Sequence, residues 1–496
     1  MKVALVFNPF CYKLHEENLR IVQRYFGLFP PLSLAWVAGI VEKAGHEAEI
    51  IDARTLRLTP QQVVSHLKLS KPDIVGLMMT TYMFRETLGW IRGIKEALPK
   101  VKIMIGGYNL RVYPNESVTP AEIDFGCFNS AYNTVPGLLA ALENNTSLDD
   151  VPGLLFKRNG TVNQTDYGED PEFEDYPNPA RGLLPNELYA KFPTERKSFT
   201  VMVTSKGCPK GCIFCEAGRT RYNPRSIQTV VNEIEECRDK YGIREIDIFD
   251  YEFLIKRRRV LEICREIRRR NIDILWACRA RIDSVDDELL REMAGAGCGR
   301  IYYGIEAGDQ EMLDRLNKGI TLEQIRESIR LTRKHGIQSL GFFFIGSPAE
   351  TRRTIRKTLK FAKSLKLDYV QFSKTTAKPL TQLWRDLVRD TSYDYWREYI
   401  LGNTEEKALP RPWTDLSNDE IDELAVVVNV NDGRENRVLM LFLLVVVVAY
   451  TGLVVDAPQP VRRAGLMQYR FGQGALAAAA VSQQNHVSNV ARCRHF

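Results

Sequence analysis

The sequence predicts an α/β protein in which an N-terminal doubly wound, Rossmann-like parallel sheet is followed by a partial TIM-like (βα)6 barrel. Two observations carry this prediction. Residues 1–145 alternate short apolar segments with helical patterns, and a second series of the same kind runs from 198 to 390. Apolar strands that alternate with helices are typical of parallel sheets covered by helices. Ligands are therefore expected at the carboxyl edges of both sheets.

The N-terminal unit opens on an apolar segment ended by Asn8-Pro9, which is the pattern of a short buried strand. Its predicted strands are 2–7, 48–52, 73–79 and 101–105, and its predicted helices are 31–44, 60–69 and 89–98. Residues 146–197 are rich in Asn, Asp, Pro and Gly, which predicts an irregular linker between the two units.

The second unit repeats a strand followed by a helix. Its predicted strands are 199–204, 245–249, 274–278, 300–305, 339–345 and 369–372, and its predicted helices are 226–241, 256–270, 286–296, 321–335 and 351–365. Repeated βα units of this kind predict a partial barrel with its functional side chains at the carboxyl ends of the strands.

The C-terminal region, 391–496, differs from the rest of the chain. Its residues 438–455 form an apolar segment without a charge, which reaches the length of a membrane span. Three interpretations stay open: a membrane anchor, a buried or swapped apolar element, and a tail that is not native to the fold. The third would follow from a frame change near Leu424, where an amphipathic pattern stops and low-complexity sequence begins.

Composition narrows the class of protein. With 44% hydrophobic and 26% charged residues, the chain is globular. Its ten cysteines are scattered rather than arranged as a disulfide framework, which predicts a cytoplasmic protein that reaches a membrane only through 438–455. The net charge of +6 does not require a nucleic-acid partner, and none is expected.

Three cysteines provide the strongest functional signal. Cys208, Cys212 and Cys215 follow the first predicted barrel strand with the spacing Cys-x3-Cys-x2-Cys. Three thiolates on one loop can hold three irons of a [4Fe–4S] cube and leave the fourth iron open to a small molecule. A zinc site is one alternative, but it would need a fourth ligand, and no His occurs between His66 and His335. Cysteines of a plain apolar core are the other alternative.

This loop resembles the cluster motif of the radical S-adenosylmethionine (SAM) superfamily. The resemblance implies that the methionyl amine and carboxylate of SAM chelate the open iron. It also implies that an electron, from a donor such as flavodoxin or ferredoxin, cleaves SAM to a 5′-deoxyadenosyl radical. Further motifs of the superfamily match in order at 249–252, 278–283, 303–308 and 341–350, so that a radical SAM barrel would span 198–390.

These motifs imply contacts to SAM. Asp250 and Glu252 would accept hydrogen bonds from the methionyl amine, with carboxylates of a solvent-facing turn as the alternative. Arg281 would pair with the SAM carboxylate, because a guanidinium recognises carboxylates bidentately. Glu306 would accept hydrogen bonds from the ribose hydroxyls.

The fifth barrel strand would contact the adenine. The resemblance implies that its backbone binds the base and that Phe343 or Ile345 packs on the ring. Residues of an ordinary strand core are the alternative.

The N-terminal unit resembles the cobalamin-binding domain that precedes the barrel in one radical SAM subfamily. The matching segments are 29–35, 45–46, 51–53, 71–76 and 105–107. The resemblance implies a corrin at the carboxyl edge of the sheet, with Gly106 and Gly107 permitting close approach and Thr80 and Thr81 lining the nucleotide tail. The chain lacks an Asp-x-His-x-x-Gly run, and residues 129–132 replace the usual Gly-Glu-Gly-Glu. An α/β domain that has kept its fold without its ligand is the alternative.

Together these features predict an enzyme that cleaves SAM reductively. With cobalamin bound, it would transfer a methyl group to an unactivated carbon of a small-molecule substrate. One alternative is a radical SAM cyclase or oxidoreductase without methyl transfer. The other is a non-catalytic relative that binds a cluster or a corrin.

Overall fold

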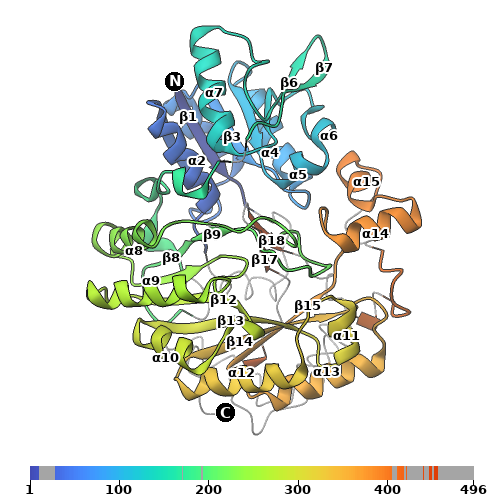
Figure 1. Cartoon of the computed structure of the whole chain (residues 1–496). Coiled ribbons are helices and arrows are strands. Elements are labelled where there is room, and N and C mark those ends of the chain that lie inside the picture. Colours follow the sequence, from blue (N-terminus) through green and yellow to red (C-terminus); the bar gives the residue numbers. More distant parts are fainter. Residues whose placement is uncertain are drawn as a thin grey trace, which may run out of the picture.

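The computed structural model describes residues 1–9, 28–169, 171–190, 194–404, 410–417, 420–421, 439–440, 446–449 and 452–455. Figure 1 shows two α/β units, with the N-terminal unit at the top of the view and the barrel below it. Each unit is built on a seven-stranded sheet. The predicted fold class is confirmed.

The N-terminal sheet has the order β2-β1-β3-β4-β5-β6-β7. Its strands are β1 (Lys2–Phe7), β2 (Glu47–Asp52), β3 (Ile74–Met78), β4 (Lys102–Gly106), β5 (Phe125–Cys127), β6 (Leu154–Arg158) and β7 (Thr161–Gln164), and its helices are α2 (Leu32–Lys43), α3 (Pro60–Ser70), α4 (Phe84–Ala97), α5 (Tyr108–Val112), α6 (Pro114–Val118) and α7 (Ala131–Asn144). The first five strands are parallel. Apolar side chains pack on α3 and α4 on one face and on α2 and α7 on the other, which makes the sheet doubly wound.

The hairpin of β6 and β7 extends this sheet by two antiparallel strands. It lies inside residues 146–197, which were expected to be an irregular linker. Asn159 and Gly160 at its turn both have positive φ, at 52° and 79°, as a tight hairpin turn requires. The N-terminal sheet therefore extends further along the chain than its apolar segments predict.

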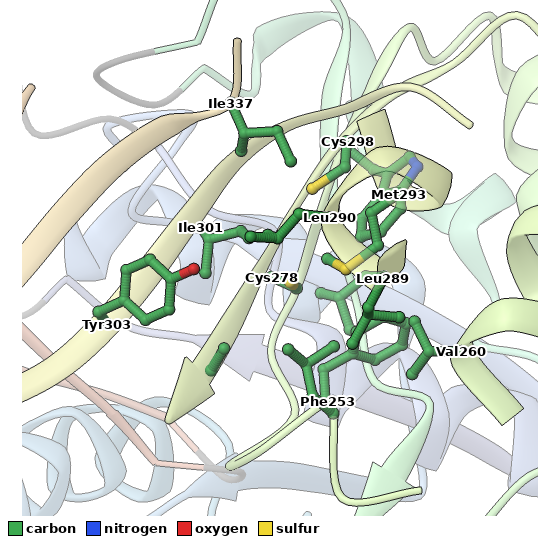
Figure 2. Close-up of a cluster of buried hydrophobic side chains, with 14 of the residues drawn as sticks. Phe253, Val260, Cys278, Leu289, Leu290, Met293, Cys298, Ile301, Tyr303 and Ile337 are labelled. Carbon is green, nitrogen blue, oxygen red and sulfur yellow. The ribbon is translucent and has the colours of Figure 1, made fainter. Parts of the chain in front are cut away.

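The barrel sheet is parallel throughout, in the order β16-β15-β14-β13-β12-β11-β8. Its main strands are β8 (Phe199–Met202), β11 (Glu245–Ile248), β12 (Leu275–Arg281), β13 (Cys298–Glu306), β14 (Gln338–Ile345) and β15 (Tyr369–Lys374), and the helices of this part are α8 (Ile227–Tyr241), α9 (Arg257–Arg269), α10 (Asp287–Gly295), α11 (Gln310–Arg315), α12 (Leu322–Lys334), α13 (Arg352–Ser364), α14 (Gln382–Thr391) and α15 (Tyr395–Leu401). Figure 2 shows the core between strands and helices, where Cys278, Ile301 and Tyr303 face Leu289 and Met293. Such a core fixes the strands and leaves their carboxyl ends free for chemistry.

Helices α14 and α15 lead back from the barrel to the N-terminal unit (Figure 1). Trp396 lies in the same apolar core as β1, β3 and α4. Arg85 donates to the carbonyl oxygen of Tyr399 over 2.8 Å, and the Tyr113 hydroxyl lies 2.9 Å from both carboxylate oxygens of Asp394. The beginning of the predicted C-terminal region 391–496 therefore binds the two units together.

The apolar segment 438–455 is described only in part. Its described residues form strands: β16 (Leu439–Met440), which pairs with β15, and the antiparallel hairpin of β17 (Val446–Ala449) and β18 (Gly452–Val455). Among the described residues, no helix is both long and apolar enough to cross a membrane. The other residues of the segment, and those from 456 on, lie outside the described part.

Candidate active site

The three cysteines lie in a loop at the carboxyl edge of the barrel. β9 (Ser205–Lys206) pairs with β10 (Asn223–Pro224) and closes the base of this loop. Gly207 has a φ of +76°, and a Cβ there would lie 1.9 Å from the carbonyl oxygen of Arg221. Only glycine can therefore occupy the point where the chain enters the loop.

Hydrogen bonds inside the loop fix the backbone of the cysteines. The N–H of Cys208 donates to the Thr220 hydroxyl and the N–H of Thr220 donates to the carbonyl of Cys208, each over 3.0 Å. The N–H of Cys215 donates to the carbonyl of Cys212 over 3.2 Å. Burial, with smaller contributions from Glu216 and the two neighbouring thiols, raises the pKa of the Cys215 thiol to about 12. The three side chains therefore share one site, in which a metal would have to displace their protons.

The donor set fits an iron–sulfur cluster better than a single ion. The three cysteines form no disulfide. In the part of the chain that the structure describes, no three His, Cys, Asp or Glu side chains are grouped to hold one metal ion. A [4Fe–4S] cube does not require such convergence, because each thiolate binds a different iron.

Arg281 joins this loop to the end of β12. Its Nη1 lies 3.6 Å from the Sγ of Cys212, and its Nε donates to Asp283 over 2.8 Å. Its Nη2 donates to the backbone carbonyl of Lys318 over 2.5 Å. Burial opposes the charge, but Asp283 raises the pKa of Arg281 above its ordinary value. A fixed cation therefore lies beside the cysteines, as an anion-binding role requires.

Glu306, at the end of β13, forms a buried ion pair that sequence reasoning missed. The Nζ of Lys318 lies 2.8 Å from Oε1 of Glu306, and both side chains are 6% exposed. Burial alone would lower the pKa of Lys318, but Glu306 and Cys212 raise it. Glu306 also has a φ of +69°, a strained conformation for a residue with a side chain. A lysine in a short turn gives no sequence signal that it will be buried.

Asp250 and Glu252 bind the protein itself. Asp250 accepts hydrogen bonds from the N–H and hydroxyl of Thr204 and from the hydroxyl of Ser205, each over 2.6 Å. Glu252 accepts from two backbone N–H groups, one of them that of Arg281. Burial raises the pKa of both carboxyls, that of Glu252 to about 7. The solvent-facing alternative is wrong, and these carboxyls tie β11 to the ends of β8 and β12.

The predicted adenine contacts on β14 face the other way. Phe343 is fully buried in the core against the helices and stacks on Phe372 with ring centroids 5.1 Å apart, and Ile345 packs against α13. Phe344 lies on the inner face, with its ring centroid 4.8 Å from that of Phe214 in the cysteine loop. The assignment of Phe343 and Ile345 to the base is corrected, because neighbouring side chains of a strand point to opposite faces.

The predicted corrin residues lie together at the carboxyl edge of the N-terminal sheet. Thr80 and Thr81 are buried just after β3. Gly107 has a φ of +133°, and a Cβ there would lie 2.4 Å from the carbonyl oxygen of Met79, so it serves the close approach of β3 and β4. At Gly106 a Cβ would meet no atom within 4 Å. Gly106 is therefore the glycine that leaves room for a ligand at this edge.

The segment that departs from Gly-Glu-Gly-Glu begins α7. Ser130 is its N-cap and accepts from the N–H of Tyr132 over 3.2 Å. The ring of Tyr132 stacks on that of Tyr176, with centroids 5.1 Å apart. Residues 129–132 thus cap a helix and pack on the segment that leads to the barrel.

A chain of hydrogen bonds joins the two carboxyl edges. The hydroxyls of Tyr108, which follows Gly107, and Tyr251 lie 3.1 Å apart, and the Tyr251 hydroxyl donates to Glu216 over 3.1 Å. Glu216 directly follows Cys215. The cysteine loop and the Gly106 edge therefore face each other, which the sequence could not show because the contact joins Tyr108 and Tyr251, which are 143 residues apart.

Comparisons with known proteins agree with this architecture. The B12 binding domain family matches residues 20–139, and the radical SAM superfamily matches residues 202–362. An uncharacterized methyltransferase of Pyrococcus horikoshii is 31% identical over 406 residues, which cover 80% of this chain and 86% of the relative. The chain belongs to the radical SAM superfamily. It is a radical SAM enzyme whose barrel follows a B12-binding domain.

Two further relatives of this radical SAM enzyme extend the comparison. An anaerobic magnesium-protoporphyrin IX monomethyl ester cyclase of Rubrivivax gelatinosus is 28% identical, over 73% of this chain and 67% of the cyclase. The solved structure of the radical SAM methyltransferase TsrM from Kitasatospora setae superimposes with a TM-score of 0.62 at 20% identity, over 79% of this chain and 75% of TsrM. The latter likeness establishes a shared fold.

Proposed function

We propose that this protein is a cobalamin-dependent radical SAM methyltransferase that acts on an unactivated carbon of a small-molecule substrate. The observation that supports the proposal is the series of hydrogen bonds from Tyr108 through Tyr251 to Glu216, which runs from the edge of the B12-binding domain to the cysteine loop. A radical source and a methyl donor can act on one carbon only if both are held within reach of it. TsrM, whose fold this chain shares, was solved with cobalamin and a [4Fe–4S] cluster.

The chain's own residues would divide the work as follows. Cys208, Cys212 and Cys215 would hold the cluster, and Arg281 and Glu306 would bind SAM. When bound, the cluster and SAM supply a 5′-deoxyadenosyl radical, and cobalamin supplies the methyl group. An electron donor such as flavodoxin or ferredoxin would reduce the cluster.

Two of these residues, and one aromatic contact beside them, are supported by their surroundings. Arg281 is held beside Cys212 by Asp283, so its charge is in place before a carboxylate arrives. Glu306 is held by Lys318, which fixes the direction of its carboxylate. The contact of Phe214 with Phe344 covers the cysteine loop with apolar surface and would keep water from a radical.

A radical SAM cyclase is the second candidate. The Rubrivivax gelatinosus relative carries that name, and its match covers 73% of this chain. A cyclase that transfers no methyl group would consume SAM without forming S-adenosylhomocysteine. The two candidates therefore differ in a product that can be measured before the substrate is known.

The test is an anaerobic product analysis. The protein is reconstituted with iron and sulfide, supplied with cobalamin, SAM and a strong reductant, and analysed for 5′-deoxyadenosine and S-adenosylhomocysteine. The variant with Cys208→Ala, Cys212→Ala and Cys215→Ala is the control without a cluster. Both products from the wild type alone are expected.

Each other result decides between the candidates. 5′-Deoxyadenosine without S-adenosylhomocysteine, in the presence of bound cobalamin, would favour the cyclase. Neither product from a protein with a full cluster would overturn both and leave a non-catalytic relative.

A further inference from the structure

The hydrogen bonds between Tyr108, Tyr251 and Glu216 form a continuous link from one unit to the other. Tyr251 donates to a carboxylate oxygen of Glu216 over 3.1 Å, and its own oxygen, 3.1 Å from that of Tyr108, can accept from it at the same time. A phenol can donate one bond and accept another, so both bonds form together. We name these three residues the tyrosine link.

Both ends of the tyrosine link are anchored at cofactor edges. Tyr108 follows Gly107, where a Cβ would lie 2.4 Å from the carbonyl oxygen of Met79, so its position is fixed against the end of β3. Glu216 follows Cys215, whose carbonyl accepts from the N–H of Gly218 over 3.2 Å. A displacement at either edge therefore changes the geometry of the link.

The middle of the link is also held in place. Tyr251 lies between Asp250 and Glu252, and both carboxyls are occupied by hydrogen bonds to the ends of neighbouring strands. The backbone on each side of Tyr251 is thus fixed.

We propose that Tyr108, Tyr251 and Glu216 are positioning residues that couple the seating of the corrin to the cluster loop, so that each cofactor site responds to the other. This inference rests on the proposed function. Coupling through such a link is reciprocal. A bound cluster would raise the affinity for cobalamin by the same factor by which bound cobalamin raises the affinity for the cluster. Since one hydrogen bond contributes modestly, a factor of roughly two to ten is expected.

The test measures cobalamin binding rather than turnover. The dissociation constant for hydroxocobalamin is determined for cluster-free and cluster-loaded protein from the corrin absorbance. The wild type should bind cobalamin roughly two- to tenfold more tightly when loaded. In Tyr108→Phe and Tyr251→Phe, which remove one hydroxyl each and keep the ring, this ratio should fall to about one.

A matched control comes from a tyrosine outside the link. Tyr303 is buried on the outer face of the barrel sheet, and its hydroxyl lies 2.7 Å from that of Thr332. Tyr303→Phe removes a buried hydroxyl in the same way and should keep the wild-type ratio. The contacts of α15 with the N-terminal unit stay intact in all three variants, so the two units remain docked.

Electron paramagnetic resonance of the reduced cluster gives a second readout. Cobalamin should change the cluster signal in the wild type and in Tyr303→Phe, and leave it unchanged in Tyr108→Phe and Tyr251→Phe. A wild-type ratio that persists in both link variants would overturn the inference, as would a ratio of one in a wild type that binds both cofactors. Failure of the loaded wild type to bind cobalamin at all would overturn the proposed function together with the inference.

Discussion

Glu350 closes the turn after β14, and its charge should make the protein less stable as the pH rises. Its side chain is 1% exposed, and one carboxylate oxygen accepts from the N–H groups of Gly346 and Ser347 over 2.6 and 3.0 Å. Burial raises its pKa from the ordinary 4.5 to about 7. The folded protein therefore holds this proton more tightly than the unfolded chain does between those two pH values.

The size of the effect follows from the shift of the pKa. Below pH 4.5 the carboxyl is protonated in both states and costs nothing; above pH 7 the folded state carries the full cost of a buried charge. Between pH 5 and pH 8 the wild type should lose about 2.5 kcal/mol through Glu350. Glu350→Gln keeps an oxygen that can accept both backbone bonds and carries no charge, so it should escape this loss.

The assay is urea unfolding of the cluster-free protein at both pH values. The free energy of unfolding of Glu350→Gln minus that of the wild type should rise by about 2.5 kcal/mol from pH 5 to pH 8. Taking this difference cancels the contribution of every other titrating group. The same difference at both pH values, or a variant less stable than the wild type at pH 8, would refute the reasoning.

Three further substitutions test the site. Gly207→Ala should abolish cluster loading, measured as iron per protein, because its Cβ would collide with the backbone. The control is Gly242→Ala, at a φ of +65° in open space, which should lower the free energy of unfolding by about 1 kcal/mol and keep the iron. Lys318→Met should leave Glu306 buried without its partner, lowering the free energy of unfolding by about 3–5 kcal/mol and weakening SAM binding in equilibrium dialysis. Phe344→Ala should make the cluster absorbance bleach roughly two- to tenfold faster in air, because it uncovers the loop.

Each of these expectations has an opposing result. Full iron content in Gly207→Ala would mean that the chain can enter the cysteine loop through another backbone conformation at residue 207. Unchanged SAM affinity in Lys318→Met, with lower stability, would assign the ion pair to folding alone. A bleaching rate for Phe344→Ala equal to that of the wild type would remove the aromatic pair from the protection of the cluster.

The predictions that succeeded rest on local patterns. The strands β1 and β3 are apolar on both faces because helices cover both sides of the sheet, and such segments are visible without any partner. The three cysteines lie within one loop, so their spacing alone supports the cluster site, which stays a prediction. The missed hairpin had a local signal as well, because Asn159-Gly160 between short strands is a strong turn pattern. The surrounding segment is rich in other turn-forming residues, which hid this signal.

What sequence reasoning misassigned or missed depended on which face a side chain takes or on a distant partner. Phe343 and Phe344 are identical in type, and only the register of β14 against its neighbours decides which one reaches the cysteine loop. The pairing of Lys318 with Glu306 depends on a turn folding back over the strand ends. Neither the facing of Phe344 nor the pairing of Lys318 with Glu306 can be predicted from composition or spacing.

The motif after β11 illustrates why family resemblance and structure assign different work to the same residues. Asp250 holds the end of β8 and Glu252 holds the end of β12, so the two acidic residues fix the strands that carry the cysteine loop and Arg281. The residue between them, Tyr251, is the one whose hydroxyl reaches toward the other unit. The charged residues of this motif therefore build the geometry of the strand ends, while the residue between them makes a contact between the two units.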